Sequence, residues 1–184
     1  MSEAKTFRYH RDPNRIIEGW PQQRYALSGL YELCLFLKKR IPLHWMCELG
    51  SAYGESTVVF AQFFQWVTAV DEWKIKEDPT MPDPEKVFDE CVQRHGIFKI
   101  KGHTRVAAFV GAERSLDFLY IDADHRFDAV AGDIMCWLPK MKRHRFIGGH
   151  DWMNPYCMGV TLAVKYLFGK PYRTFPDGSW VVKV

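Results

Sequence analysis

The sequence lacks any apolar run long enough to cross a membrane. The longest candidates are interrupted by Glu32, Glu55 or Gln62, and they fall well short of the roughly 20 apolar residues that a bilayer requires. The N-terminal sequence MSEAKTFRYHRDPNR also lacks the apolar segment and the small-residue cleavage site of an export signal. Together these absences predict a cytoplasmic protein with no membrane span.

Cysteine and net charge are both low. The chain of 184 residues has five cysteines and no CxxC pair, and 25 basic residues against 22 acidic ones leave a net charge of +3. The odd number and wide spacing of the cysteines favour reduced, mostly buried thiols over disulfides or zinc ligands. The net charge is too small to indicate a polyanionic partner by itself. The cysteines are Cys34, Cys47, Cys91, Cys136 and Cys157.

The first residues differ in pattern from the rest of the chain. Residues 1–20 show little periodicity, and we interpret them as an irregular arm before one domain that spans residues 21–184. Pro21 suits the first turn of a helix. Apolar residues then recur at three- and four-residue spacing up to the basic residues 38–40, and Ile41-Pro42 ends this predicted helix.

Short apolar runs alternate with helical patterns along the remainder. Two further runs flank a turn at residues 176–179, which predicts a hairpin. Strands that alternate with helices indicate a parallel sheet, and the hairpin adds antiparallel strands near one edge. The predicted fold is therefore α/β: a single-domain, doubly wound, Rossmann-like sheet of seven mostly parallel strands. The predicted strands are 44–49, 65–70, 97–101, 116–121, 145–149, 172–175 and 180–184, and the predicted helices after the first are 56–64, 84–95, 104–112, 127–138 and 157–167.

Polar and small residues follow the predicted parallel strands. Ligands of open parallel sheets bind outside the carboxyl ends of the strands, close to the point where the strand order reverses. The sequence therefore places a ligand site among these strand ends. They are residues 48–57, Asp71-Glu72, Gly102-His103-Thr104, Asp122-Ala123-Asp124-His125 and His150-Asp151-Trp152.

The segment after the first strand has the spacing ExGxxxGxST. Its glycines, Gly50 and Gly54, allow the backbone to approach a ligand, and Ser56 opens a helix whose free N–H groups favour an anion. This is not the GxGxxG dinucleotide fingerprint. A looser loop that starts with Glu48 suits a ligand with both an ammonium and a carboxylate group, and Asp71 suits two ribose hydroxyls.

These motifs, CELGSAYGEST, VTAVDEW, KIKGHT, LDFLYIDADHRFDAVAGDI, FIGGHDW and GVTLAV, resemble the class I S-adenosylmethionine-dependent methyltransferases over about residues 25–184. Within this family, the chain resembles the branch of small enzymes related to the catechol, caffeoyl-CoA and antibiotic-sugar O-methyltransferases. The resemblance implies that residues 48–56 hold the methionine moiety, that Asp71 binds the ribose and that Gly102 to Thr104 border the adenine. It assigns to the cofactor Glu48, Gly50, Ser51, Tyr53, Gly54, Ser56, Asp71, Glu72, Gly102, His103, Thr104 and Asp122.

The resemblance also implies a catalytic group on the fourth and fifth strand ends, formed by Asp122, His125, His150 and Asp151. Asp122 and Asp151 match the metal ligands of the metal-dependent relatives. Catechol-type enzymes have an asparagine where this chain has Trp152, so His150 or Asn154 would complete a site for Mg²⁺ or a softer metal. His125 falls where those enzymes place a lysine base, and an imidazole with an ordinary pKa near 6.5 suits that role. The alternative is that these residues only cap helices, which fits Asp124 best.

The sequence thus predicts methyl transfer from S-adenosylmethionine to a hydroxyl of a small molecule, sugar or glycan, with or without a divalent cation. A homodimer that closes the site is a further expectation. One alternative is N- or nucleic-acid methylation, supported only by basic runs at residues 38–40 and 140–145. Both runs are expected at helix ends on the opposite edge of the sheet, so no nucleic-acid partner is expected. A third alternative is a non-catalytic module that binds the cofactor.

Overall fold

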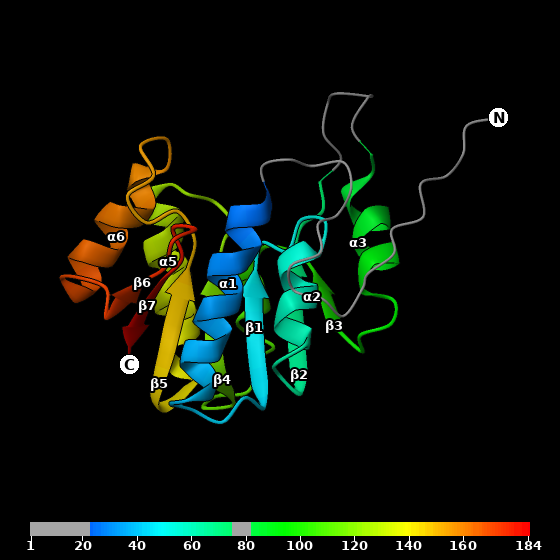
Figure 1. Cartoon of the computed structure of the whole chain (residues 1–184), viewed down its shortest axis with the longest axis horizontal. Coiled ribbons are helices and arrows are strands. Elements are labelled where there is room, and N and C mark those ends of the chain that lie inside the picture. The colour runs from blue at the N-terminus through cyan, green and yellow to red at the C-terminus, as the bar shows by residue number, and fades with distance from the viewer. Residues whose placement is uncertain (1–22, 75–81) are drawn as a thin grey trace.

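The computed structural model describes residues 23–74 and 82–184 (Figure 1). The predicted N-terminal arm and Pro21 lie outside the described residues. Among the residues described, no helix has both the length and the apolar character that crossing a membrane demands. The elements are α1 Gln23–Lys38, β1 Trp45–Leu49, α2 Glu55–Ala61, β2 Trp66–Asp71, α3 Pro84–Val92, β3 Phe98–Lys101, α4 Thr104–Ala107, β4 Leu116–Ile121, α5 Phe127–Trp137, a short 3-10 helix Leu138–Lys140, β5 Met141–Gly149, α6 Met158–Phe168, β6 Arg173–Thr174 and β7 Trp180–Lys183.

The strands form one seven-stranded sheet in the order β3-β2-β1-β4-β5-β7-β6. The first five of these are parallel, whereas β7 pairs antiparallel with β5 and β6 pairs antiparallel with β7. This confirms the predicted doubly wound fold with its C-terminal hairpin. The strand order reverses between β1 and β4, which both lie in the middle of the sheet, and this point is the expected place for a ligand.

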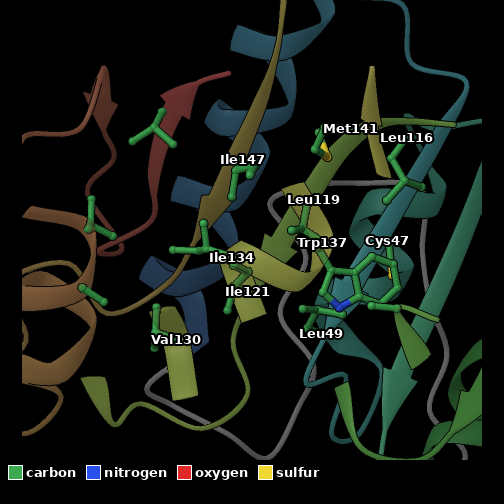
Figure 2. Packing of buried hydrophobic residues seen from close by; sticks show 14 of the residues in the cluster. Cys47, Leu49, Leu116, Leu119, Ile121, Val130, Ile134, Trp137, Met141 and Ile147 are labelled. Atoms are coloured by element: carbon green, nitrogen blue, oxygen red, sulfur yellow. The ribbon is translucent and has the colours of Figure 1, made fainter. Parts of the chain in front are cut away.

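Alternate residues of the strands face two separate layers of helices. Met46 of β1 and Phe118 of β4 pack with α1 and α2 on one face. Cys47 of β1 and Leu119 of β4 point to the other face, where they pack with α5 and α6. Figure 2 shows this second cluster, in which Trp137 of α5 lies beside Cys47. Because both faces are covered, the central strands are buried along most of their length and only their ends are open to a ligand.

Three predicted helices end earlier than expected. The helix predicted for residues 104–112 ends at Ala107, the one predicted for 56–64 ends at Ala61, and the one predicted for 84–95 ends at Val92. After each helix, backbone N–H groups bond to carbonyls three residues back, as in Phe109 to Val106. Phe109 is 85% exposed, so apolar burial does not stabilise another turn there.

The fifth strand is longer than predicted. It begins at Met141, so most of the basic run 140–145 is strand rather than helix end. The cause is Asp117 of β4, which is fully buried and accepts hydrogen bonds from Lys142 Nζ and Arg145 Nε, both at 2.9 Å. Burial favours the neutral acid, but these two bonds outweigh it and lower the pKa of Asp117. The expectation that this run lies at a helix end was therefore wrong for Lys142 and Arg145.

Candidate functional site

The loop after β1 is organised by Glu48, which is fully buried. Its carboxylate accepts hydrogen bonds from the hydroxyls of Ser51 at 2.9 Å, Ser56 at 2.5 Å and Thr57. Burial raises the pKa of Glu48 to about 7, although the three hydroxyl donors oppose that rise. Glu48 thus ties the loop to the start of α2 from inside the protein.

This network bears on the roles predicted for Glu48 and Ser56. A hydroxyl has one hydrogen to donate, and that of Ser56 goes to Glu48. Ser51 is likewise buried and turned to Glu48. A direct contact of these three side chains with a ligand stays a prediction, whereas their part in shaping the loop is visible.

Two glycines allow the loop to cross the end of the sheet. Gly50 has a φ of +85°, and a Cβ there would stand 2.1 Å from the carbonyl oxygen of Asp122. Gly54 has a φ of +88° and packs against Phe88 of α3. Tyr53, between them, is partly buried. The loop after β1 therefore lies directly on the loop after β4.

Asp71, at the end of β2, links the loop after β1 to the loop after β2. Its carboxylate accepts a hydrogen bond from Ala52 N at 2.9 Å and another from Trp73 N at 2.7 Å. Each carboxylate oxygen keeps a further lone pair, so two hydroxyls can still bind there. The neighbouring residue, Glu72, pairs with Lys74 at 2.6 Å.

Trp73 completes this connection. Its ring is 2% exposed and packs on Phe88 of α3. Its indole nitrogen donates to the carbonyl of Ala52 at 2.8 Å. The ring is therefore part of the core, and its polar edge fixes the loop.

The loop after β3 borders the Asp71 side of the site. Gly102 N donates to Asp71 O at 2.9 Å, and a Cβ on Gly102 would meet no atom within 4 Å, so there is open space beside it. His103 caps α4 by accepting from Arg105 N, and the Thr104 hydroxyl donates to Asp133. The side chains of His103 and Thr104 thus have structural partners, and their predicted contact with adenine is not tested.

The four predicted catalytic residues come together. His125 Nε2 lies 3.3 Å from Asp122 Oδ1 and 3.0 Å from Asp151 Oδ2, and His150 Nδ1 lies 3.5 Å from Asp151 Oδ1. The carboxyl ends of β4 and β5 are adjacent in the sheet, which brings these side chains into one cluster. Asp124 is not part of it. Instead, it pairs with the backbone N–H and the guanidinium of Arg126, and α5 has no side-chain cap, so the capping alternative for Asp124 was wrong.

The residues of the cluster shift one another's pKa values strongly. Hydrogen bonds to Asp122 and Asp151 raise the pKa of His125 to about 10. Burial opposes protonation of His150, but Asp151 and the nearby carboxylates raise its pKa to about 9. The two imidazoles in turn hold the pKa of Asp151 far below its usual range. This corrects the expectation of an ordinary imidazole at position 125, because two carboxylates hold its proton at neutral pH.

The loop after β5 is held from the C-terminal hairpin. Asp151 and Met153 both have positive φ angles, 63° and 60°. Trp152 N donates to Gly178 O at 2.9 Å, and Trp180 Nε1 donates to His150 O at 3.0 Å. Sequence reasoning missed Gly178 and Trp180, because they lie far along the chain and carry no reactive group.

The donors present suit a divalent cation. Single ligand atoms of Asp122, His150 and Asp151 all lie within 4.8 Å of one another, and so do those of His125, Asp151 and Cys157. Carboxylate oxygen and imidazole nitrogen are both common metal donors. The residues therefore fit the group that the metal-dependent relatives imply.

Comparisons with known proteins identify the family of the chain. Residues 47–152, more than half of the chain, match the model of a family described as a methyltransferase domain. Among curated proteins, no sequence matches the chain.

Solved structures share the fold at low sequence identity. Cofactor-bound Rv0187 from MTB is 15% identical with a TM-score of 0.67, over 90% of this chain and 84% of that one. An O-methyltransferase from Bacillus cereus in complex with SAH is 14% identical with a TM-score of 0.64, over 89% and 84%. CalS11, a TDP-rhamnose 3'-O-methyltransferase of calicheamicin biosynthesis, is 14% identical with a TM-score of 0.64, over 88% and 80%.

The family match covers β1 to the loop after β5, which are the elements that carry the linked loops and the ionisable cluster. The chain therefore belongs to the methyltransferase domain family, and it shares the fold of these solved structures.

Proposed function

We propose that the chain methylates a hydroxyl group of a small molecule or sugar. The observation that carries this proposal is the cluster of Asp122, His125, His150 and Asp151 beside the loop after β1. O-methylation needs a group that takes the hydroxyl proton next to the bound methyl donor. A site that only bound the cofactor would have no need for four ionisable side chains at that place.

The loops after β1, β2 and β3 are proposed to hold S-adenosylmethionine. The free lone pairs of Asp71 suit the two ribose hydroxyls, and the open space beside Gly102 suits the adjacent base. The backbone of residues 50–54, fixed by Glu48 and Trp73, is proposed to position the methionine part. This arrangement would direct the sulfonium methyl towards the ends of β4 and β5.

The acceptor hydroxyl is proposed to lie against the cluster. Its oxygen attacks the methyl carbon, a C–O bond forms as the C–S bond breaks, and the thioether of S-adenosylhomocysteine leaves. The imidazoles of His125 and His150 already carry their protons at neutral pH, so the hydroxyl proton passes to the carboxylate of Asp122, which lies against His125. Alignment of the hydroxyl with the methyl group supplies much of the rate.

A divalent cation on Asp122, His150 and Asp151 would lower the pKa of a hydroxyl bound to it when present. The protein residues would orient the acceptor in either case. Structural neighbours that are named O-methyltransferases support a hydroxyl as the acceptor, and one of them is named for TDP-rhamnose. A neighbour with a TM-score of 0.56 is named as a phosphoethanolamine N-methyltransferase, so the acceptor atom needs its own test.

The test is transfer of a tritiated methyl group from S-adenosylmethionine to paired acceptors. Phenols, sugars and nucleotide sugars are compared with their amine analogues and with analogues whose hydroxyls are already methylated. We expect transfer to free hydroxyls only. Transfer to amines, or saturable cofactor binding with no transfer to any hydroxyl, would overturn the proposal.

Two variants locate the chemistry. Asp151→Asn removes a charge that contacts both imidazoles, and we expect kcat to fall about 100-fold or more with little change in cofactor affinity. Asp124→Asn is the matched control, because Asp124 follows the same strand but hydrogen-bonds to Arg126 outside the cluster. An equal loss in both variants would show that the cluster has no special role.

A further inference from the structure

The third position of the candidate metal site differs from the pattern of the metal-dependent relatives. Those enzymes have asparagine where this chain has Trp152, which packs against the core beneath α5 and α6 and offers no oxygen donor in its side chain. We propose that the imidazole of His150 replaces the missing oxygen ligand, and that the centre therefore selects a transition-metal ion such as Zn²⁺ or Co²⁺ over Mg²⁺.

The other candidate for the third position, Asn154, is already committed. Its amide nitrogen, which has no lone pair to offer, donates to Asp151 Oδ1 at 2.5 Å. Its amide oxygen accepts the backbone N–H of Tyr156 at 3.0 Å. Asn154 thus orients the Asp151 carboxylate from outside, as outer-shell partners of metal ligands do.

The spacing of the remaining donors fits one ion. His150 Nδ1 is 3.5 Å from Asp151 Oδ1, and Asp122 adds an oxygen within 4.8 Å of both residues. Metal–ligand bonds of about 2.1 Å place neighbouring ligand atoms about 3 Å or more apart. The carbonyl of His150 is held by the Trp180 indole, so the backbone that carries the imidazole is fixed without an ion.

The donor chemistry then sets the preference. Mg²⁺ demands oxygen ligands in a near-octahedral arrangement, whereas imidazole suits Zn²⁺ and its first-row neighbours. Two carboxylates with one imidazole leave positions open for water or an acceptor oxygen, as in catalytic rather than structural sites. A catalytic role for such an ion rests on the proposed O-methylation, but binding of the ion does not. Metal binding is therefore measured without cofactor or acceptor.

The experiment measures binding of Zn²⁺, Co²⁺ and Mg²⁺, each as the metal alone, to the metal-free full chain by calorimetry. The variant His150→Asn restores an amide oxygen, and the control His44→Asn changes an exposed imidazole that faces Asp117 at the opposite edge. We expect His150→Asn to weaken Zn²⁺ binding at least about 10-fold, with Mg²⁺ binding kept or strengthened. His44→Asn is expected to leave both unchanged.

A measurement on the wild-type chain keeps the test independent of variant folding. Zinc added to protein with ¹⁵N-labelled histidine should shift the ring nitrogen resonances of His150, and Co²⁺ should show visible d–d absorption. Zinc affinity that is unchanged by His150→Asn, a His150 ring that does not respond to zinc, or Mg²⁺ binding tighter than Zn²⁺ would each overturn the proposal. Failure of methyl transfer with these metal results intact would overturn only the proposed function.

Discussion

The indole nitrogen of Trp73 donates a 2.8 Å hydrogen bond to the carbonyl oxygen of Ala52, so the end of β2 fixes the loop after β1. Both residues have positive φ angles, 43° and 41°, which only such tertiary contacts maintain in residues other than glycine. A phenylalanine ring at position 73 has no N–H group and could not donate this bond. The link between these two residues is therefore open to a direct test.

Replacement of Trp73 by phenylalanine keeps the buried ring but removes this bond. We expect the free energy of unfolding to fall by about 1–2 kcal/mol and the affinity for S-adenosylmethionine to fall about 3- to 10-fold. Urea unfolding and equilibrium dialysis measure the two quantities. Trp66→Phe, at a tryptophan that is 44% exposed, is the control and should change neither.

Gly50 tests the contact between the loops after β1 and β4. Alanine at this position combines a strained φ with a Cβ 2.1 Å from the Asp122 carbonyl oxygen, so we expect a loss of at least about 2 kcal/mol in stability. Gly96→Ala shares the positive φ but meets no atom within 4 Å, and should lose only about 1 kcal/mol. Thermal unfolding with calorimetry compares them, and equal losses would contradict the contact.

Glu48 predicts a pH dependence of stability. Its pKa rises from an ordinary value of 4.5 to about 7 in the folded protein, so the folded chain binds this proton more tightly than the unfolded chain. The stabilisation is complete below pH 4.5 and is lost as the pH rises to about 7, by about 3 kcal/mol in total. Glu48→Gln stays neutral, and its unfolding free energy should fall less steeply over this window than that of the wild type. Parallel curves in urea titrations from pH 4.5 to 8 would refute it.

Loss of the buried Asp117 carboxylate should destabilise the protein more than loss of either cation that pairs with it. Asp117→Ala leaves two cations that are partly exposed, and Lys142→Ala leaves a carboxylate that still has Arg145. We expect a loss of about 2–4 kcal/mol for the first change and at most about 1 kcal/mol for the second. Neither change should alter cofactor affinity, because this ion pair lies at the opposite edge of the sheet. Denaturant unfolding and equilibrium dialysis provide the measurements.

The sequence allowed prediction of the sheet because each apolar run is short and each helical stripe has a clear period. The boundaries of β4 agree with the prediction, and those of the other parallel strands differ chiefly at β5. There, the run KMKRHR looks like an exposed segment. Its partner, the buried carboxylate of Asp117, lies more than 20 residues earlier in the sequence. Local composition carries no information on that partner.

The candidate site was predicted as a set of residues but not as a set of contacts. The positions of Asp122, His125, His150 and Asp151 followed from the ends of two strands, which are neighbours in any sheet of this order. The raised pKa of His125 did not follow, because it depends on loop geometry set by Asp151. Nor did the burial of Trp73, because an aromatic residue in a loop has no periodicity to show which way it faces.

The hairpin of β6 and β7 has a consequence for the order in which the site matures. During synthesis, every carboxylate and imidazole of the cluster leaves the ribosome before Gly178 and Trp180, whose groups fasten the backbone at residues 150 and 152. A nascent chain that stops short of these residues would carry the reactive groups without the geometry that unites them. Assembly of the centre thus awaits the synthesis of residues 178–180.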